Sequence, residues 1–263
     1  MIADLLPNKN IVLDSDSVIL AFYPAFCEAF EAVLDRPATV MQPLFGLQER
    51  FGLTPEENNA VWRHFEREGY WGKLKPMPGA PDAIAELTRE GFVVHVVSGV
   101  PPRITADRLR NFDMFGFKPA SFHAAGSGRA EKRTIIEKIN PIAFVDDRKE
   151  HGHSVQFVPH LAWVMGESPA EQYPVSGARI DVIADDLPQW VNYFLADPVA
   201  ALKRRAEPVD IRANRHHMDL DLVTFTAGEG FSLVSERRAA LLARKKDSVA
   251  MDFHAPRRSR PTA

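Results

Sequence analysis

The sequence predicts an α/β protein with a doubly wound, Rossmann-like parallel sheet, and two observations lead to this prediction. Short runs rich in Val, Ile and Phe are continuous rather than alternating, as in parallel strands buried on both faces. These runs are "NIVLD", "FVVHVVS", "IAFVDD" and, less clearly, "SVQFVP", at residues 10–14, 92–98, 142–147 and 154–159. Helical patterns separate them, and this alternation is typical of βαβ units.

The helical patterns between the strands carry their own start and stop signals. "APDAIAELTREG" (80–91) has Pro and Asp at its start and Gly91 at its end, which are the residues that favour helix beginnings and ends. "RITADRLRNFDMFG" (103–116) and "EKRTIIEKIN" (131–140) have the same character. We therefore expect a core formed by residues 1–20 and 78–202.

Residues 21–77 interrupt the alternation. "AFCEAFEAVL" and "TPEENNAVWRHFEREGYW" are helical in pattern and crowded with aromatic residues, and "KLKPMPGAP" follows with Pro and Gly as punctuation. An insertion directly after the first strand lies above the strand tips, so we expect a small helical cap here. Its aromatic residues either form the core of the cap, which is the favoured interpretation, or provide a stacking surface for a ligand.

The charge of the chain is unevenly distributed. Residues 203–263 contain 13 Lys and Arg against 8 Asp and Glu, a net charge of +5, whereas residues 1–202 contain 19 against 27, a net charge of −8. The segment 203–263 is therefore expected to be a basic C-terminal extension, partly disordered, with a solvated helix at "SERRAALLARKKD". A nucleic-acid or protein contact through this extension is the alternative interpretation.

Composition excludes several classes of protein. A single cysteine, Cys27, excludes an internal disulfide framework and fits a reducing compartment, and its apolar surroundings favour a core residue. No uncharged apolar run approaches the length of a membrane span, and the N-terminus lacks the pattern of a secretory signal. The expectation is a cytoplasmic protein without a membrane partner.

Three of the strand-like runs end in reactive groups that are far apart in the sequence. Asp14 and Asp16 follow the first run, Ser98 ends the second, and Asp146 and Asp147 end the third. In a parallel sheet all carboxyl ends share one edge, and ligands bind in the crevice outside it. These groups are therefore expected to converge, unless Asp14 and Asp16 belong only to a solvated turn.

A lysine in the helical pattern 131–140 completes this set. Lys132 lies at the start of the pattern and Lys138 is the competing candidate, but Lys138 is closer to the next strand, which favours Lys132. Two histidine-containing stretches, "HGH" (151–153) and "RHHMDLD" (215–221), lack a partner motif at a recognised metal-site spacing and are expected to be loops.

This combination of groups suits phosphate-ester chemistry. Two or three carboxylates form a hard oxygen site for Mg²⁺. A hydroxyl, backbone N–H groups and an ammonium group can hold a phosphate. An unprotonated aspartate beside the metal can attack phosphorus and form an aspartyl phosphate. If the first strand stops near Asp14, the following turn brings Asp16 to the leaving oxygen, where burial can raise its pKa and allow it to act as a general acid.

The order of these motifs matches a known family. "IVLDSDSVIL", "VVHVVSG", Lys132 and "AFVDD" resemble the four motifs of the haloacid dehalogenase-like (HAD) superfamily, over roughly residues 8–195. The second aspartate resembles the phosphatase pattern rather than that of the dehalogenases. "REGYWGKLKPMPGAPDAI", "EKRTIIEKINPIAFVDDR" and "PHLAWV" are similar to parts of the 5′(3′)-deoxyribonucleotidases, whose small helical cap carries aromatic residues that stack on the nucleobase.

The resemblance implies a role for each residue of the predicted site. Asp14 is the nucleophile and a metal ligand. Asp16 is the acid/base, and it gives its backbone carbonyl to the metal. The phosphate-binding residues are Ser98, Gly99 and Lys132, and the metal ligands are Asp14, Asp16, Asp146 and, as an outer partner, Asp147. For Asp147, the alternative is that it pairs only with Arg148.

Two positions depart from the family pattern. Ser17 stands where the family usually has Gly, and Ser98-Gly99-Val100 stands where Thr-Ser-Pro is common. The altered second motif bears on nucleotide specificity. The expected function is Mg²⁺-dependent hydrolysis of a phosphomonoester, with a nucleoside monophosphate as first choice and a small sugar or organic-acid phosphate as runner-up. A catalytically silent HAD-like binding module that uses its basic tail is the hypothesis from a different class.

Overall fold

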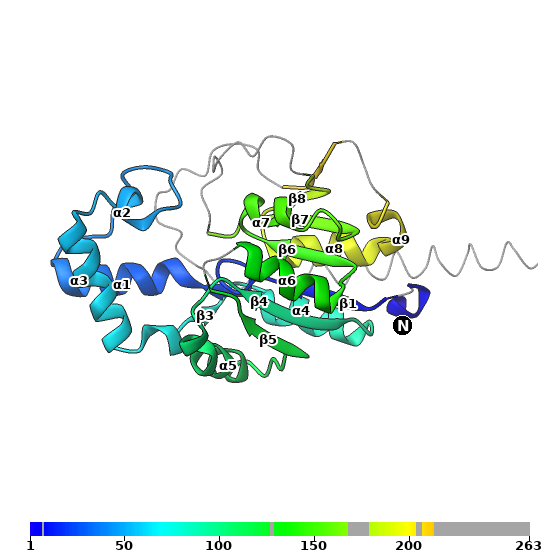
Figure 1. Cartoon of the computed structure of the whole chain (residues 1–263), viewed down its shortest axis with the longest axis horizontal. Helices are drawn as coiled ribbons and strands as arrows, with labels where there is room; N and C mark the ends of the chain where they lie inside the picture. The colour runs from blue at the N-terminus through cyan, green and yellow to red at the C-terminus, as the bar shows by residue number, and fades with distance from the viewer. Residues whose placement is uncertain (7, 127–128, 168–178, 204–206, 213–263) are drawn as a thin grey trace, which may run out of the picture. The chain divides into compact units, whose positions relative to one another are not determined.

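The computed structural model describes residues 1–6, 8–126, 129–167, 179–203 and 207–212 (Figure 1). Its main feature is a seven-stranded sheet with the order β5-β4-β1-β6-β7-β8-β9, in which neighbouring strands pair in parallel. The strands of this sheet are β1 (Asn10–Leu13), β4 (Val93–Ser98), β5 (Ser121–Ala124), β6 (Ala143–Asp146), β7 (His160–Val164), β8 (Val182–Ala184) and β9 (Val209–Asp210). The predicted fold class, a doubly wound parallel α/β sheet, is confirmed.

Helices pack on both faces of this sheet, as Figure 1 shows. Leu13 belongs to a large apolar cluster that also contains buried side chains of α4, α5 and α8, whereas Val12 belongs to a second cluster with Ile136 of α6. Adjacent strand residues point to opposite faces, so two neighbouring residues of β1 join two different cores. The helices are α4 (Ala80–Arg89), α5 (Thr105–Met114), α6 (Arg129–Ile139), α7 (Lys149–Ser154), α8 (Leu187–Ala196) and the short α9 (Pro198–Ala201).

The strand order places a topological switch point between β1 and β6. From β1 the chain proceeds to β4 and β5 on one side, and then returns to β6, β7 and β8 on the other. Leu13 is in register with Val96 of β4 and with Val145 of β6. The carboxyl ends of these three central strands therefore lie at the same level, which is where parallel α/β sheets bind ligands.

The segment 21–77 forms helices that are inserted between β1 and β4. They are α1 (Phe22–Leu34), α2 (Leu47–Arg50), α3 (Pro55–Arg67) and the 3₁₀ turn η2 (Tyr70–Gly72). Before and after them, β2 (Leu20–Ala21) pairs in an antiparallel manner with β3 (Lys75–Pro76). Thr54 accepts a hydrogen bond from the backbone N–H of Glu57 and the Glu57 carboxylate accepts one from that of Thr54, a capping box that starts α3.

Aromatic side chains pack against one another between these helices. Phe26 and Phe30 of α1 contact Phe51, and Phe65 of α3 lies edge-on to Trp71 with 4.9 Å between ring centroids. All five side chains are buried. An inserted segment of this size needs an apolar interior of its own, and these rings supply it.

One predicted strand is wrong. "SVQFVP" (154–159) contains Ser154, the last residue of α7, and the turn after it, and the strand is the next segment, His160–Val164. Val155 and Val158 are three residues apart and both enter the core, whereas Phe157 is 38% exposed. That spacing fits a turn rather than the period of two of a strand. The "HGH" stretch was also misjudged, because it lies in α7 and not in a loop.

The segment 203–263 lies mostly outside the described residues, including the predicted helix "SERRAALLARKKD" and the stretch "RHHMDLD". In its described part, Val209–Asp210 forms β9 and pairs with β8 at the edge of the sheet. The sheet therefore continues beyond residue 202. Among the described helices, none has the length and apolar character needed to cross a membrane.

Candidate active site

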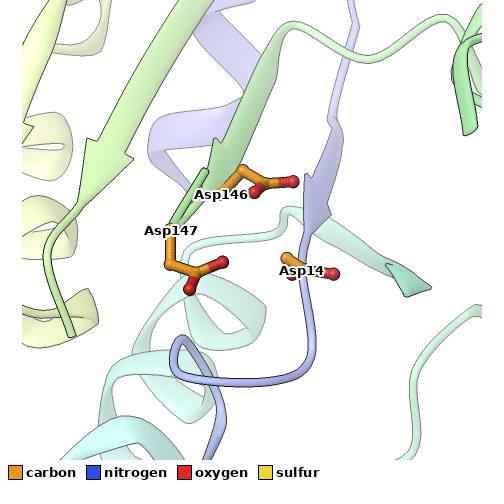
Figure 2. A group of neighbouring side chains, drawn as sticks. All are labelled: Asp14, Asp146 and Asp147. Atoms are coloured by element: carbon orange, nitrogen blue, oxygen red, sulfur yellow. The ribbon is translucent and has the colours of Figure 1, made fainter. Parts of the chain in front are cut away.

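Three aspartates meet at the switch point between β1 and β6. Asp14 follows β1, and its backbone N–H donates to the carbonyl of Val145 at 2.8 Å, which continues the strand pairing by one residue. Asp146 ends β6 and Asp147 follows it. Each aspartate places one carboxylate oxygen within 4.8 Å of the others, and all three are buried (Figure 2). The structure thus brings together three of the four predicted metal ligands.

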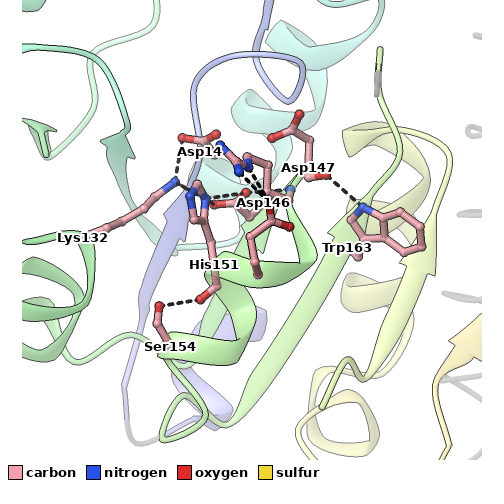
Figure 3. A network of polar contacts seen from close by, with 9 residues as sticks. Asp14, Lys132, Asp146, Asp147, His151, Ser154 and Trp163 are labelled. Atoms are coloured by element: carbon pink, nitrogen blue, oxygen red, sulfur yellow. Dashed lines mark hydrogen bonds and ion pairs between the residues drawn. The ribbon is translucent and has the colours of Figure 1, made fainter. Parts of the chain in front are cut away.

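Lys132 of α6 lies between two of these carboxylates. Its Nζ is 3.0 Å from an oxygen of Asp14 and 2.6 Å from an oxygen of Asp146 (Figure 3), and the residue is 2% exposed. Burial alone would lower the pKa of Lys132, but the two carboxylates outweigh burial and raise it. The ammonium group therefore stays charged. Lys138, the competing candidate, is exposed on the same helix.

The two carboxylates that share Lys132 differ in acidity. Burial raises the pKa of Asp14 to about 6, with Lys132 opposing the rise and the neighbouring Asp146 adding to it. For Asp146, burial would also raise the pKa, but His151 and Lys132 outweigh it and lower the pKa well below its usual range. Asp146 is thus the fixed negative charge of the pair. Asp14 is the member of the pair with the higher pKa.

His151 is a member of this network that sequence reasoning did not assign. Its Nδ1 lies 2.9 and 3.0 Å from the two oxygens of Asp146 and 3.2 Å from the Lys132 Nζ (Figure 3). The signal that could have found it is its place in the sequence, because His151 lies in the first turn of the helix that begins two residues after Asp147. The contact also explains why a histidine stands in this stretch without a metal-ligand partner.

Asp16 lies apart from the three-aspartate group. Its carboxylate contacts Arg108 of α5, whose Nη2 is 2.6 Å from one oxygen and 2.8 Å from the other. Burial raises the pKa of Asp16, and the guanidinium of Arg108 limits the rise. The side chain of Asp16 is 26% exposed, so it is partly accessible to solvent. Nothing in the local sequence around Arg108 predicted this ion pair.

Ser98 and Gly99 are placed beside this group by β4. Ser98 is the last residue of β4 and is 1% exposed, and Gly99 is exposed. A Cβ on Gly99 would lie 3.6 Å from the carbonyl of Gly126 in the loop after β5, so the two loops run close together. Ser98 and Gly99 therefore lie at the same sheet edge as Asp14.

Glu167 joins the core to the first turn of α1. Its carboxylate accepts hydrogen bonds from the backbone N–H of Phe22 at 2.8 Å and of Tyr23 at 3.1 Å, and from the hydroxyl of Ser17 at 3.2 Å. These N–H groups have no partner within the helix, and a carboxylate at a helix N-terminus stabilises it. Burial nevertheless raises the pKa of Glu167 to about 7 despite these hydrogen bonds.

The turn after Asp16 is tightly packed against the same loop. Ser17 has a φ of 60°, a left-handed conformation that favours glycine. Gly166, which precedes Glu167, also has a positive φ, and a Cβ there would lie 1.9 Å from the Ser17 carbonyl oxygen. Glycine is therefore required at position 166 for this approach. Ser17, in contrast, adopts a glycine-like conformation while keeping a side chain that contacts Glu167.

The residues at the sheet edge fit a divalent cation. Asp14, Asp146 and Asp147 offer three carboxylate oxygens in one small buried region, and Mg²⁺ and similar hard cations prefer oxygen ligands. The charge of these three carboxylates exceeds that of the single ammonium group of Lys132, which lies between Asp14 and Asp146. A bound cation would supply the missing positive charge.

Comparisons with known proteins agree with this geometry. Residues 8–109 match the family model of the 5′ nucleotidase, deoxy (Pyrimidine), cytosolic type C protein, which includes Asp14, Asp16 and Ser98 but ends before Lys132. No curated protein matches the sequence.

Several solved structures share the fold. A protein described as a phosphoglycolate phosphatase from Haemophilus somnus 129pt is 16% identical, with a TM-score of 0.52 over 72% of this chain and 99% of that chain. One described as a β-phosphoglucomutase from Thermotoga maritima is 16% identical, with a TM-score of 0.51 over 71% and 98%. One described as a haloacid dehalogenase-like hydrolase from Bacteroides fragilis is 13% identical, with a TM-score of 0.50 over 70% and 99%.

At these identities the solved structures show the shared fold, which is that of the HAD-like hydrolases. Together with the match over residues 8–109, they support a resemblance to the HAD-like hydrolases and, over that segment, to the 5′-nucleotidase family. The resemblance inferred from the sequence motifs is thereby confirmed.

Proposed function

We propose that this protein is a Mg²⁺-dependent phosphomonoester hydrolase that forms an aspartyl phosphate on Asp14, and that its substrate is a nucleoside monophosphate. The observation that carries the proposal is the position of Asp14 at the switch point, in the group with Asp146 and Asp147 and in contact with Lys132. A carboxylate in this position can act as a nucleophile, because the surrounding cations reduce its repulsion from an anionic phosphate.

In the first half of the reaction, a carboxylate oxygen of Asp14 attacks phosphorus and the bond to the ester oxygen breaks. Asp16 gives a proton to that leaving oxygen, and the alcohol departs. Lys132, the Ser98 hydroxyl and the Gly99 N–H hold the phosphoryl oxygens. The raised pKa of Asp16 is consistent with a group that carries a proton at this stage.

In the second half, water attacks the phosphorus of the aspartyl phosphate and Asp16 takes a proton from that water. The P–O bond to Asp14 breaks, so inorganic phosphate leaves and the Asp14 carboxylate is restored. Asp14, Asp146, Asp147 and the backbone carbonyl of Asp16 would hold Mg²⁺. When bound, this ion would neutralise charge on the phosphoryl oxygens during both displacements.

The nucleotide assignment is supported by the family match and by the aromatic residues of the inserted segment. Phe22, which follows β2, stacks against Trp62 and Trp71 with ring centroids 6.1 and 5.8 Å apart. Trp62 is only partly buried, so this group of rings reaches the surface. Flat aromatic faces of this kind can stack on a nucleobase. The runner-up is a small sugar or organic-acid phosphate, because two structural neighbours are described as acting on such compounds.

The test is a panel of phosphomonoesters assayed with Mg²⁺ and with a chelator. We expect hydrolysis to require the metal and to be lost in Asp14→Asn, while Asp113→Asn, at an exposed position of α5, keeps the activity of the unmodified protein. Turnover by Asp14→Asn that equals that of the unmodified protein would refute the aspartyl-phosphate mechanism. Equal rates on nucleotides and on sugar phosphates would refute the nucleotide assignment alone.

A further inference from the structure

Arg108 is a fully buried cation whose only ion-pair partner among the described residues is Asp16. It lies in the first half of α5 and is 0% exposed. Its Nη2 lies 2.6 and 2.8 Å from the two oxygens of Asp16, a residue 92 positions away in the sequence. Removing a guanidinium from water costs several kcal/mol unless an anion compensates it. The Asp16 carboxylate supplies that compensation.

The other side of the Arg108 guanidinium contacts Trp71. Nη1 donates to the Trp71 carbonyl at 3.5 Å, and the guanidinium carbon lies 5.0 Å from the centre of a Trp71 ring. Asn111, one turn later in α5, donates to the same carbonyl at 2.7 Å. Trp71 belongs to the η2 turn, through which the chain returns from the inserted helices to the core. Arg108 therefore bridges this return segment and Asp16.

A residue that only held the Trp71 segment and the turn of Asp16 together would not need a charge. Apolar side chains of similar volume replace buried ion pairs with little or no loss of stability. An aspartate that must deliver a proton to one oxygen atom, in contrast, needs a fixed direction, because proton transfer requires hydrogen-bond distance and alignment. Nη2 donates a hydrogen bond to Oδ2 of Asp16 and lies close to Oδ1 as well, so the carboxylate is held against the Arg108 guanidinium.

We propose that Arg108 is a positioning residue, which orients the Asp16 carboxylate toward the leaving oxygen of the substrate and ties that orientation to the Trp71 segment. This inference rests on the proposed phosphatase function. It assigns to a residue outside the four sequence motifs a role in leaving-group protonation. The contribution of Arg108 to the rate of hydrolysis is largest for substrates that have a poor leaving group.

The test compares two substrates that differ in their need for a proton. An alkyl phosphate requires protonation of its leaving oxygen, whereas 4-nitrophenyl phosphate releases a stable anion. The ratio kcat/KM reports the steps up to departure of this leaving group. We expect Arg108→Met to lower kcat/KM about 30-fold for the alkyl phosphate and less than about 3-fold for 4-nitrophenyl phosphate. The larger value corresponds to a partial loss of the rate enhancement that a general acid provides. Arg108→Lys, which keeps the charge, should recover part of the loss.

Two controls separate positioning from a loss of structure. Arg110→Met changes an exposed arginine of the same helix, which pairs with Asp107, and should leave both rates unchanged. In an Asp16→Asn background, Arg108→Met should cause no further loss on the alkyl phosphate, because residues that act through one group are not additive. A near-ultraviolet circular dichroism spectrum identifies variants that have lost tertiary structure. If Arg108→Met is one of them, the two substrates are compared in Arg108→Lys instead.

Equal losses on both substrates in folded Arg108 variants would overturn the positioning role, as would a further loss in the Asp16→Asn background. Neither outcome would touch the proposed aspartyl-phosphate mechanism, which fails if Asp14→Asn turns over as fast as the unmodified protein or if the unmodified protein hydrolyses no phosphomonoester. A 10-fold or larger selective loss on the alkyl phosphate that Arg108→Lys partly restores would support the role.

Discussion

The ammonium group of Lys132 lies 2.6 Å from a carboxylate oxygen of Asp146, and both residues are 2% exposed. Lys132 comes from α6 and Asp146 from the end of the strand that follows this helix. The pair therefore fixes the helix to the sheet edge and balances charge in the same place. A buried ion pair of this kind responds strongly to the loss of one partner, because the other charge remains buried.

Lys132→Met should both destabilise the protein and abolish hydrolysis. Without the ammonium group, Asp14 and Asp146 lose their shared cation, and we expect the free energy of unfolding in the absence of metal to fall by about 3 kcal/mol. Urea unfolding of the metal-free protein measures this change. Lys138→Met, at an exposed position of the same helix, should change stability by less than about 0.5 kcal/mol. Equal stabilities of the two variants would show that the Lys132 pairs contribute nothing net.

Added Mg²⁺ should stabilise the folded protein. A cation that binds the three aspartates of the native state but not the unfolded chain raises stability by about 2.7 kcal/mol when its concentration is 100 times Kd. We expect Tm to rise with Mg²⁺ concentration and the rise to be smaller in Asp147→Asn, which lacks one carboxylate of the group. Asp113→Asn, which is exposed on α5, should keep the full rise.

A thermal melt with and without Mg²⁺ gives this comparison without any enzymatic assay. If Tm did not move at millimolar Mg²⁺, the three-aspartate group would not be a magnesium site. If Asp147→Asn kept the full shift, Asp147 would lie outside the set of ligands.

The parts of the fold that could be predicted from the sequence are those that depend on local pattern. Continuous apolar runs predicted β1, β4 and β6. Because parallel strands end at the same edge of a sheet, the sequence also predicted that Asp14 and Asp146 lie at one edge, although they are 132 positions apart. The fourth strand was misplaced by six residues. Its neighbourhood contains two apolar runs, and only packing decides that Val155 and Val158 belong to a turn.

The contacts that could not be predicted are those between distant residues with ordinary local surroundings. Arg108 lies in a helical pattern with several other charged residues, and nothing in that pattern marks it as buried. Glu167 stabilises the first turn of α1 from 145 positions away. His151 matches no recognised metal-ligand spacing, and its partner in the structure is the carboxylate of Asp146. Polar contacts between residues far apart in the sequence depend on the assembled fold, so local patterns do not predict them.

Ser17 offers a test of backbone strain in the turn that follows Asp16. Its φ of 60° costs a residue with a side chain about 1 kcal/mol relative to glycine. Ser17→Ala and Ser17→Gly both remove the hydroxyl that contacts Glu167, but only glycine also relieves the strain. We therefore expect Ser17→Gly to be more stable than Ser17→Ala by about 1 kcal/mol in urea unfolding. Equal midpoints with equal m-values would show that the turn carries no such strain.

Glu167 should make the stability of the protein depend on pH. Burial raises the pKa of its carboxyl from 4.5 to about 7 in the folded state. Between these values the folded state binds more protons than the unfolded state. Stability from this group is therefore greatest at low pH and declines as pH rises through 7. From pH 5 to pH 8 we expect this contribution to fall by about 2 kcal/mol.

The matched variant is Glu167→Gln, which keeps an oxygen that can accept from the N–H groups of Phe22 and Tyr23 but cannot ionise. Other groups, including Asp14 with its pKa of about 6, titrate in the same range, so the useful quantity is the difference between the two proteins at each pH. Relative to Glu167→Gln, the unmodified protein should lose stability steadily between pH 5 and pH 8 in urea unfolding. A difference that stays constant over this range, or that moves in favour of the unmodified protein, would mean that Glu167 is ionised in the fold at its ordinary pKa and that its hydrogen bonds to α1 outweigh its burial.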